Sequence, residues 1–303
     1  MAASQLALRD LALIVGVVAV WGISFVAIKF GLREIPPFAL ASLRFFLAAL
    51  PLVFFVHRPR IPWRLIVGYG LAIGVFQFGL LFLGMALGMP AGLSSVVIQL
   101  QVFFTIALAA ASLGDRFSPE DLLGAAVATV GVAVLGMHRL AEGASSTLVG
   151  FALVIGAALA WGIGNVIAKR AAARYDGDLF ALVVWAALVA AVPLALLSLL
   201  VEGGLEVVTA VATAGALTWS CVLLLAWGST LFAFASWARL LHRYPTATIA
   251  PFGLLVPVFG LAGGALFLDE ALAPLQWTGV ALVLLGLAEN VFGAQLRAWL
   301  RRA

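Results

Sequence analysis

The hydrophobic residues of this chain form long uninterrupted runs, separated by short polar, glycine-containing or proline-containing stretches. A helix needs about 20 residues to cross the hydrocarbon core of a bilayer, and the runs approach or reach that length. The pattern therefore predicts ten membrane-spanning helices. Their expected bounds are Leu11–Phe30, Phe38–His57, Leu65–Leu87, Gly92–Ser112, Asp121–Met137, Leu148–Lys169, Leu179–Val201, Leu217–Arg239, Thr246–Leu268 and Pro274–Ala294.

The composition excludes the other broad classes of protein. Of 303 residues, 65% are hydrophobic and only 10% are charged, whereas soluble domains carry about 25% charged residues. Low hydrophobicity is the signature of disorder, and alternating apolar and polar residues are the signature of a membrane β-barrel; neither is present. We therefore predict an all-α integral membrane protein surrounded by the lipid bilayer.

The charges lie between the apolar runs and divide unevenly between the two sides. One side of the predicted topology holds 13 Lys and Arg residues and the other holds 3, with Arg44 inside a span. The positive-inside rule then places both termini in the cytoplasm. This distribution, and not the net charge of +4, explains the basic character, so we expect no nucleic-acid partner. A single cysteine, Cys221, predicts neither a disulfide framework nor a thiolate metal site.

The two halves of the chain share residues at fixed spacings. Trp21-Gly22 and Trp161-Gly162 begin matching segments 140 residues apart, and each segment ends in a lysine. Five further pairs recur at an offset of 155 residues: Pro90 and Pro245, Asp115 and Glu270, Pro119 and Pro274, Gly124 and Gly279, and Gly131 and Gly286. Such spacing indicates a duplicated unit. We predict two five-helix repeats, residues 1–143 and 144–303, that form one transport unit.

Because five is odd, the second repeat enters the membrane from the side opposite to the first. Inverted repeats are typical of secondary transporters, which bind substrate near the midplane between the halves. A membrane-embedded enzyme and a channel are the alternatives. The sequence shows no phosphate-binding loop, metal-ligand cluster or Ser/His constellation. It favours a transporter with a gated central cavity, no cofactor and no enzymatic activity.

The Trp-Gly-x6-Lys segments, together with the stretch Leu268–Gly279 (LDEALAPLQWTG), resemble the drug/metabolite transporter superfamily in its ten-helix EamA-type branch. The resemblance covers nearly the whole chain. Within that branch the sequence is most similar to the YddG-type aromatic amino-acid exporters. The resemblance implies export of small metabolites, chiefly aromatic or other apolar amino acids, by alternating access across a bacterial inner (plasma) membrane. An exporter of other metabolites or of drugs with the same fold is the alternative.

Polar side chains in the middle of a span are costly and indicate either a helix-helix hydrogen bond or a water-filled cavity. Gln77 is the one amide on a glycine-containing face of the third span. Gln99 and Gln101 lie two residues apart, which is about 200° of helical rotation, so both cannot face one cavity. Gln101 is favoured as a cavity residue, since it shares a face with Thr105. Asn165 is a further candidate, in the sixth span.

Aromatic residues accompany these amides and suggest a surface for an apolar substrate. Trp161 lies one turn from Asn165, and the repeat mates of these two residues are Trp21 and Phe25. Two more candidate aromatic residues, Phe234 and Trp237, share a face of the eighth span with Thr230. Lipid-facing or interfacial positions are the alternative for any of these aromatic residues.

Three basic residues are candidates for a charge contact or a gate. Lys29 and Lys169 are repeat mates near opposite ends of their spans, where snorkelling to the headgroups is the simpler explanation. Arg44 follows Pro36 by eight residues, about 12 Å along a helix. At that depth it snorkels outward, pairs with a helix-end carbonyl or attracts a carboxylate.

Acidic residues are missing from the middle of the predicted spans. Glu289, near the end of the tenth span, is the one acid close to a span apart from helix-end groups. Proton relays in membranes commonly use Asp, Glu or His. The sequence therefore predicts facilitated diffusion of the substrate, without obligatory proton exchange.

Overall fold

The computed structural model describes residues 6–141, 145–175 and 179–300, and all regular structure within them is helical. Within this part of the chain, nine helical stretches are long and apolar enough to cross a membrane, and a tenth apolar helix, α2, has 17 residues. The prediction of a ten-helix membrane protein is thus confirmed. The predicted boundary between the repeats, at residues 143 and 144, lies outside the described residues.

Several spans consist of more than one helical element. The first half contains α1 (Leu8–Gly31), α2 (Pro37–Val53), α3 (Trp63–Tyr69), η1 (Gly70–Phe78), α4 (Gly79–Ala86), α5 (Ala91–Val97), η2 (Ile98–Leu100), α6 (Gln101–Leu113) and α7 (Pro119–Ala141). The second half contains α8 (Ser145–Arg174), α9 (Leu179–Val201), α10 (Leu205–Thr213), α11 (Ala216–Leu223), η3 (Leu224–Phe232), α12 (Ala233–Arg243), α13 (Thr246–Ile249), η4 (Ala250–Leu254), α14 (Leu255–Leu268) and α15 (Pro274–Leu300).

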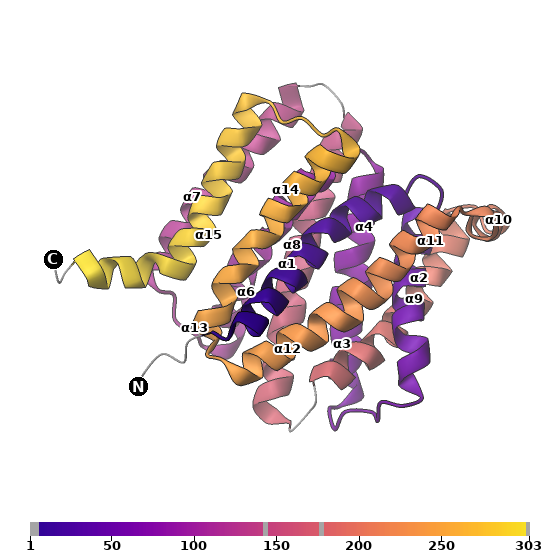
Figure 1. Ribbon diagram of the computed structural model, residues 1–303, viewed down its shortest axis with the longest axis horizontal. Coiled ribbons are helices and arrows are strands. Elements are labelled where there is room, and N and C mark those ends of the chain that lie inside the picture. Colours follow the sequence, from indigo (N-terminus) through magenta and orange to yellow (C-terminus); the bar gives the residue numbers. More distant parts are fainter. Residues whose placement is uncertain (1–5, 142–144, 176–178, 301–303) are drawn as a thin grey trace.

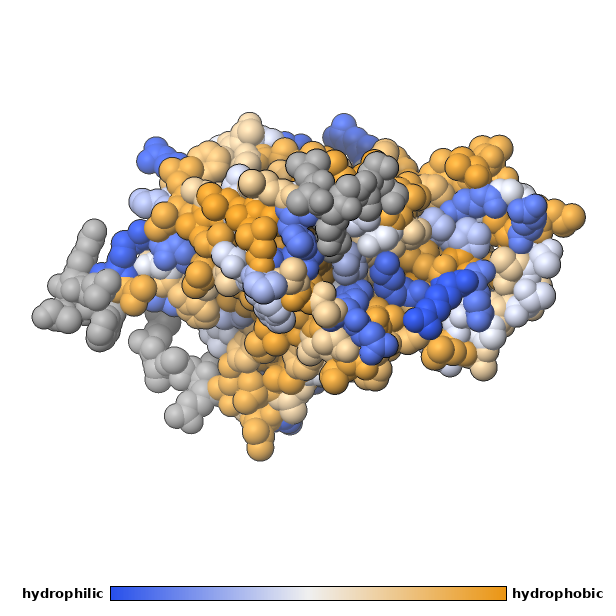
Figure 2. Space-filling view, turned by 90° about the horizontal axis from the view of Figure 1, so that it is seen from above, coloured by the Kyte–Doolittle hydropathy of each residue, from blue (hydrophilic) through white to orange (hydrophobic). Residues whose placement is uncertain are grey.

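Both ends of the described chain lie on the same side of the bundle (Figure 1). We call this side, where α1 begins and α15 ends, the terminal end, and the opposite side the distal end. The surface in Figure 2 is mostly hydrophobic, with hydrophilic residues in separate patches. Large apolar side chains such as Leu266 and Phe267 are more than half exposed, as expected for helices in contact with lipid.

The bounds of several helices differ from the prediction by a few residues, and the tenth span continues to Leu300. The second span ends at Val53 and not at His57, two residues after Pro51, whose missing N–H and ring weaken the last turn. The long loop between the seventh and eighth spans contains the short helix α10. The offset between matching residues grows from 140 at Trp21 and Trp161 to 155 at Pro90 and Pro245, so the second half carries additional residues between these positions. The loop accounts for most of them, and they form a helical segment at the distal end.

Irregular turns recur at matching positions in the two halves. The third and eighth spans each contain a nine-residue π-helical segment, η1 and η3, whose first residues are 154 positions apart. The fourth and ninth spans each contain a 3₁₀ segment, η2 and η4. Segments of π-helix often mark functional sites. These segments lie in the middle of the third, fourth, eighth and ninth spans, so the middle of the bundle is the first place to look for a functional site.

The fifth and tenth spans pack closely through glycines. A Cβ on Gly124 would lie 2.5 Å from the carbonyl oxygen of Gly286, and one on Gly131 would lie 2.7 Å from that of Gly279. Each contact becomes the other when the two halves are exchanged at the offset of 155 residues. The helices α7 and α15 run antiparallel along one flank of the bundle (Figure 1). This exchange is the relation that a two-fold axis between inverted repeats produces.

Candidate functional site

A buried arginine lies halfway along the second span. Arg44 is the eighth residue of α2, and 2% of its surface is exposed. Its Nε donates a hydrogen bond to Thr230 Oγ1 at 2.9 Å, and its Nη2 donates one to Ser229 Oγ at 3.3 Å. Both hydroxyls belong to η3, in the middle of the eighth span. The side chain therefore connects the first half of the chain to the second at mid-membrane depth.

Aromatic rings cover the guanidinium group. Its central carbon lies 3.9 Å from the ring centroid of Phe78 and 5.6 Å from that of Phe45. These two rings meet edge to face, with centroids 5.4 Å apart. Such cation–π contacts stabilise a desolvated cation. Among the described residues, no carboxylate forms an ion pair with Arg44.

The π-helical segment η3 orients the hydroxyl groups that hold this arginine. Thr230 Oγ1 donates a hydrogen bond to the carbonyl of Leu225, five residues earlier, while it accepts one from Arg44. The indole Nε1 of Trp21 donates to the carbonyl of Ser229 at 3.2 Å. The segment thus supplies acceptors to side chains of both α1 and α2.

Trp21, Phe234 and Trp237 form one aromatic cluster. The Trp21 ring lies 5.4 Å from Phe234 and 5.2 Å from Trp237, centroid to centroid. The structure therefore brings together three of the aromatic residues that the sequence suggested. Phe25 is 7% exposed and lies in the hydrophobic core.

A small cavity of about 20 Å³ adjoins Arg44. Its wall is formed by α2, the third span, α9 and the eighth span, and it includes Arg44, Phe78, Thr230 and Phe234. A volume of this size holds about one water molecule. The central cavity expected from the sequence is therefore nearly closed, and a metabolite can enter only after the surrounding helices separate.

The amide candidates form a second group, between the fourth, sixth and ninth spans. Asn165 Nδ2 donates to Gln101 Oε1 at 2.8 Å and to Thr105 Oγ1 at 3.0 Å. Gln99 Nε2 instead donates to the carbonyl of Gly253 at 3.3 Å. The two glutamines therefore face different helices, as their spacing predicted.

Trp161 and Gln77 complete the list of amide and aromatic candidates. Trp161 is half-buried beside the main core, one turn before Asn165. Gln77 lies in η1 and is 2% exposed. Neither residue lines the small cavity beside Arg44.

The family assignment follows from comparisons with known proteins. The sequence model of the EamA-like transporter family matches residues 9–137 and 148–291. The chain belongs to this family. It is 42% identical over 95% of its length to a protein of Escherichia coli (strain K12) named "Probable amino-acid metabolite efflux pump", of which 97% is covered. A Salmonella typhimurium (strain LT2) protein of the same name is 43% identical over 93% of this chain and 94% of its own.

A solved crystal structure shares the fold of this transporter. Its sequence is 24% identical, and the superposed region includes 94% of this chain and 98% of the chain in that structure, with a TM-score of 0.63. At this identity the likeness supports the ten-helix architecture alone.

Lys29 and Lys169, which occupy matching positions in the two halves of the transporter, lie at opposite ends of the bundle. Lys29 Nζ, at the distal end, donates to the carbonyl of Met85 at 2.8 Å. Lys169, at the terminal end, forms an exposed ion pair with Asp115 at 2.5 Å. Neither lies at the depth of Arg44.

The repeat mates Asp115 and Glu270 make different contacts. The Glu270 carboxylate accepts hydrogen bonds from the amides of Ala91 at 2.6 Å and Gly92 at 2.8 Å, and so caps the distal start of the fourth span. Asp115, at the terminal end, forms an ion pair with Lys169. Charged side chains therefore make contacts at both ends of this transporter.

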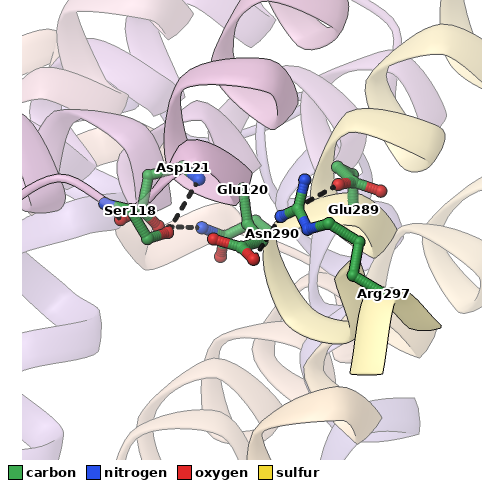
Figure 3. A network of polar contacts seen from close by, with 6 residues as sticks. All are labelled: Ser118, Glu120, Asp121, Glu289, Asn290 and Arg297. Atoms are coloured by element: carbon green, nitrogen blue, oxygen red, sulfur yellow. Dashed lines mark hydrogen bonds and ion pairs between the residues drawn. The ribbon is translucent and has the colours of Figure 1, made fainter. Parts of the chain in front are cut away.

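The acids near the terminal end form a polar network between α7 and α15 (Figure 3). Arg297 pairs with Glu120 and lies 3.6 Å from Glu289. Asn290 Nδ2 donates to Asp121 Oδ1 at 2.7 Å. Glu289, the acid noted in the sequence, thus has a cationic neighbour within a contact between two helices.

Sequence reasoning identified Arg44 but not the residues around it. Ser229, Phe45 and Phe78 were not selected, and Thr230 entered only as a companion of Phe234 and Trp237. Small hydroxyl residues and phenylalanines are common in apolar spans. A cation at mid-span was the one available signal, because it requires acceptors on neighbouring helices.

Proposed function

We propose that this EamA-family transporter exports amino acids with aromatic or other apolar side chains. The main observation in support is that hydrogen bonds between side chains in the middle of the spans connect the two halves of the chain. Arg44 reaches Ser229 and Thr230, and Asn165 reaches Gln101. A site of amides, hydroxyls and aromatic rings suits a solute with an apolar body and a polar end. The names of the Escherichia coli and Salmonella relatives support amino-acid metabolites as the substrates.

Transport proceeds by alternating access between the two five-helix repeats. The small cavity between the two halves supports this proposal, because a metabolite reaches it only after the surrounding helices separate. In the described state the distal cap is formed and the cavity is nearly closed.

The protein lies in a bacterial inner (plasma) membrane with both termini in the cytoplasm. This placement rests on the 13 to 3 division of Lys and Arg. The terminal end is then cytoplasmic, and the distal end faces outward. Reporter fusions test it: a fusion after Ala303 reports the cytoplasm, and one within residues 202–215 reports the opposite side.

Flux measurements in proteoliposomes test the substrate. Purified protein is reconstituted, and radiolabelled phenylalanine, tryptophan, leucine, serine and glutamate are compared under equal concentration gradients. We expect faster flux of the first three than of the last two. Equal rates for all five, or rates equal to those of empty vesicles, would refute the proposed substrate class.

A further inference from the structure

The charge of Arg44 has no counter-charge among the described residues. The guanidinium is 2% exposed and lies midway along a membrane span. Hydroxyl groups and ring faces recover only part of the hydration that a buried cation loses. A buried charge is normally paired, and in transporters an intramembrane cation marks a site for substrate or ion. An anionic ligand would supply the missing charge.

One side of the guanidinium is already used, and the other is available. Nε and Nη2, which lie along one edge, hold the two hydroxyls of η3. No described residue accepts a hydrogen bond from Nη1. The two terminal nitrogens form a fork that matches the two oxygens of a carboxylate. Thr230 and Ser229 therefore orient the arginine and leave its carboxylate-binding edge unoccupied.

The surroundings of Arg44 suit the rest of an amino acid with an apolar side chain. The small cavity beside it is bounded by the rings of Phe45, Phe78 and Phe234. Aromatic rings pair favourably with one another at centroid separations of about 4.5–7 Å. The arrangement supplies a positive group for one end of a solute and ring faces for the other.

A seam of small residues borders this cavity. A Cβ on Gly70 would lie 2.8 Å from the carbonyl oxygen of Ala186, and one on Gly74 would collide with Ala190. These residues place η1 directly against α9, and both helices line the cavity. The cavity has room for about one water molecule, so separation along this seam would make room for a larger molecule beside Arg44.

We propose that Arg44 binds the carboxylate of the transported solute, with Ser229 and Thr230 as positioning residues and the neighbouring rings as the surface for its apolar side chain. This inference rests on the proposed function, because it assigns the part of an amino acid that the site recognises. It also specifies a chemical requirement that the function alone does not contain. A solute without a carboxylate should bind poorly, even when its ring is unchanged.

Four related compounds test this requirement on the purified full-length transporter. Phenylalanine and 3-phenylpropanoate carry the carboxylate, whereas phenylalaninol and phenethylamine lack it. Dissociation constants come from calorimetry or ligand-induced thermal shifts in lipid nanodiscs. We expect both carboxylates to bind roughly tenfold or more tightly than the two other compounds, since a charge-assisted hydrogen-bond pair is lost without them.

Substitutions of Arg44 test whether this residue causes the preference for carboxylates. Arg44→Gln should weaken both carboxylates by roughly tenfold or more and leave the other two compounds unchanged. Arg44→Lys should retain part of the preference, because it keeps the charge but not the fork. Arg33→Gln is the matched control, since Arg33 is a cation of the distal end that contacts Phe30. If Arg44→Gln does not fold, the four compounds on the parent protein still decide.

The outcomes separate this inference from the proposed function. Equal binding of phenylalanine and phenylalaninol, or undiminished carboxylate binding to Arg44→Gln, overturns the role of Arg44, even if amino acids are transported. Tight binding of 3-phenylpropanoate without transport of any amino acid supports the arginine site and refutes the proposed substrate. Failure of both carboxylates to bind overturns the inference.

Discussion

The helix cap that Glu270 provides at the start of α5 can be weakened by a substitution that keeps the shape of the side chain. In Glu270→Gln an uncharged amide replaces the carboxylate that accepts hydrogen bonds from Ala91 and Gly92. These amides are the first two of α5, where helix geometry provides no internal acceptor. The new side chain has one acceptor oxygen, and its NH₂ group faces the second amide donor. The substitution therefore removes one of the two charge-assisted bonds and turns the other into a neutral hydrogen bond.

The cost of this change follows from the two contacts. A hydrogen bond to a charged group contributes about 1.5–3 kcal/mol, and the half-exposed position of Glu270 reduces that value through solvent screening. We expect a loss of about 1–2 kcal/mol, which corresponds to roughly 5- to 30-fold more frequent opening of the first turn of α5.

Hydrogen–deuterium exchange measures this opening directly. Peptides that cover residues 89–97 should exchange faster in Glu270→Gln by the factor given above, in lipid nanodiscs at constant pH. Asp115→Asn is the matched control, because the repeat mate pairs with Lys169 at the other end of the bundle. Unchanged exchange at Ala91 and Gly92 in Glu270→Gln, or an equal increase in Asp115→Asn, would refute the reasoning.

Three further predictions use other parts of the molecule. Trp161→Ala should weaken apparent affinity for phenylalanine and tryptophan by roughly 2- to 10-fold and affect leucine less; equal flux kinetics with the parent would exclude Trp161 from the site. Gly286→Ala should cost about 1–3 kcal/mol in thermal unfolding, because its Cβ collides with α7, whereas Gly16→Ala meets no atom within 4 Å and should melt like the parent. Glu289→Gln should leave proteoliposome flux unchanged and independent of a pH gradient; proton-driven accumulation that this variant abolishes would contradict facilitated diffusion.

The spans were predictable because their signal is local. Each helix in a membrane must satisfy its own backbone hydrogen bonds, so an apolar run of sufficient length determines both the element and its approximate ends. The early end of α2 depends on Pro51, whose effect on the last turn varies with context. The π-helical and 3₁₀ segments had no comparable signal. They change the hydrogen-bond register by one residue within runs such as Gly70–Phe78, which are apolar on every side.

The candidate site was only partly predictable, because its contacts cross the bundle. The depth of Arg44 followed from its distance to Pro36 along one helix. Its partners Ser229 and Thr230 lie 185 and 186 residues away, and no periodicity within one span indicates which distant hydroxyl it meets. The same limit applied to Asn165, since its hydrogen bond to Gln101 depends on how the fourth and sixth spans pack.

Backbone and side-chain contacts take different parts in the proposed transport cycle. Close glycine contacts between α7 and α15 involve backbone atoms, which differ little between the two halves. The Glu270 cap and the Asp115–Lys169 pair depend on charged side chains. Under the proposed alternating access, we infer that the glycine-packed flank stays constant while the contacts of the charged side chains at the helix ends change. The helices around Arg44 then separate to admit a solute first from one end and then from the other.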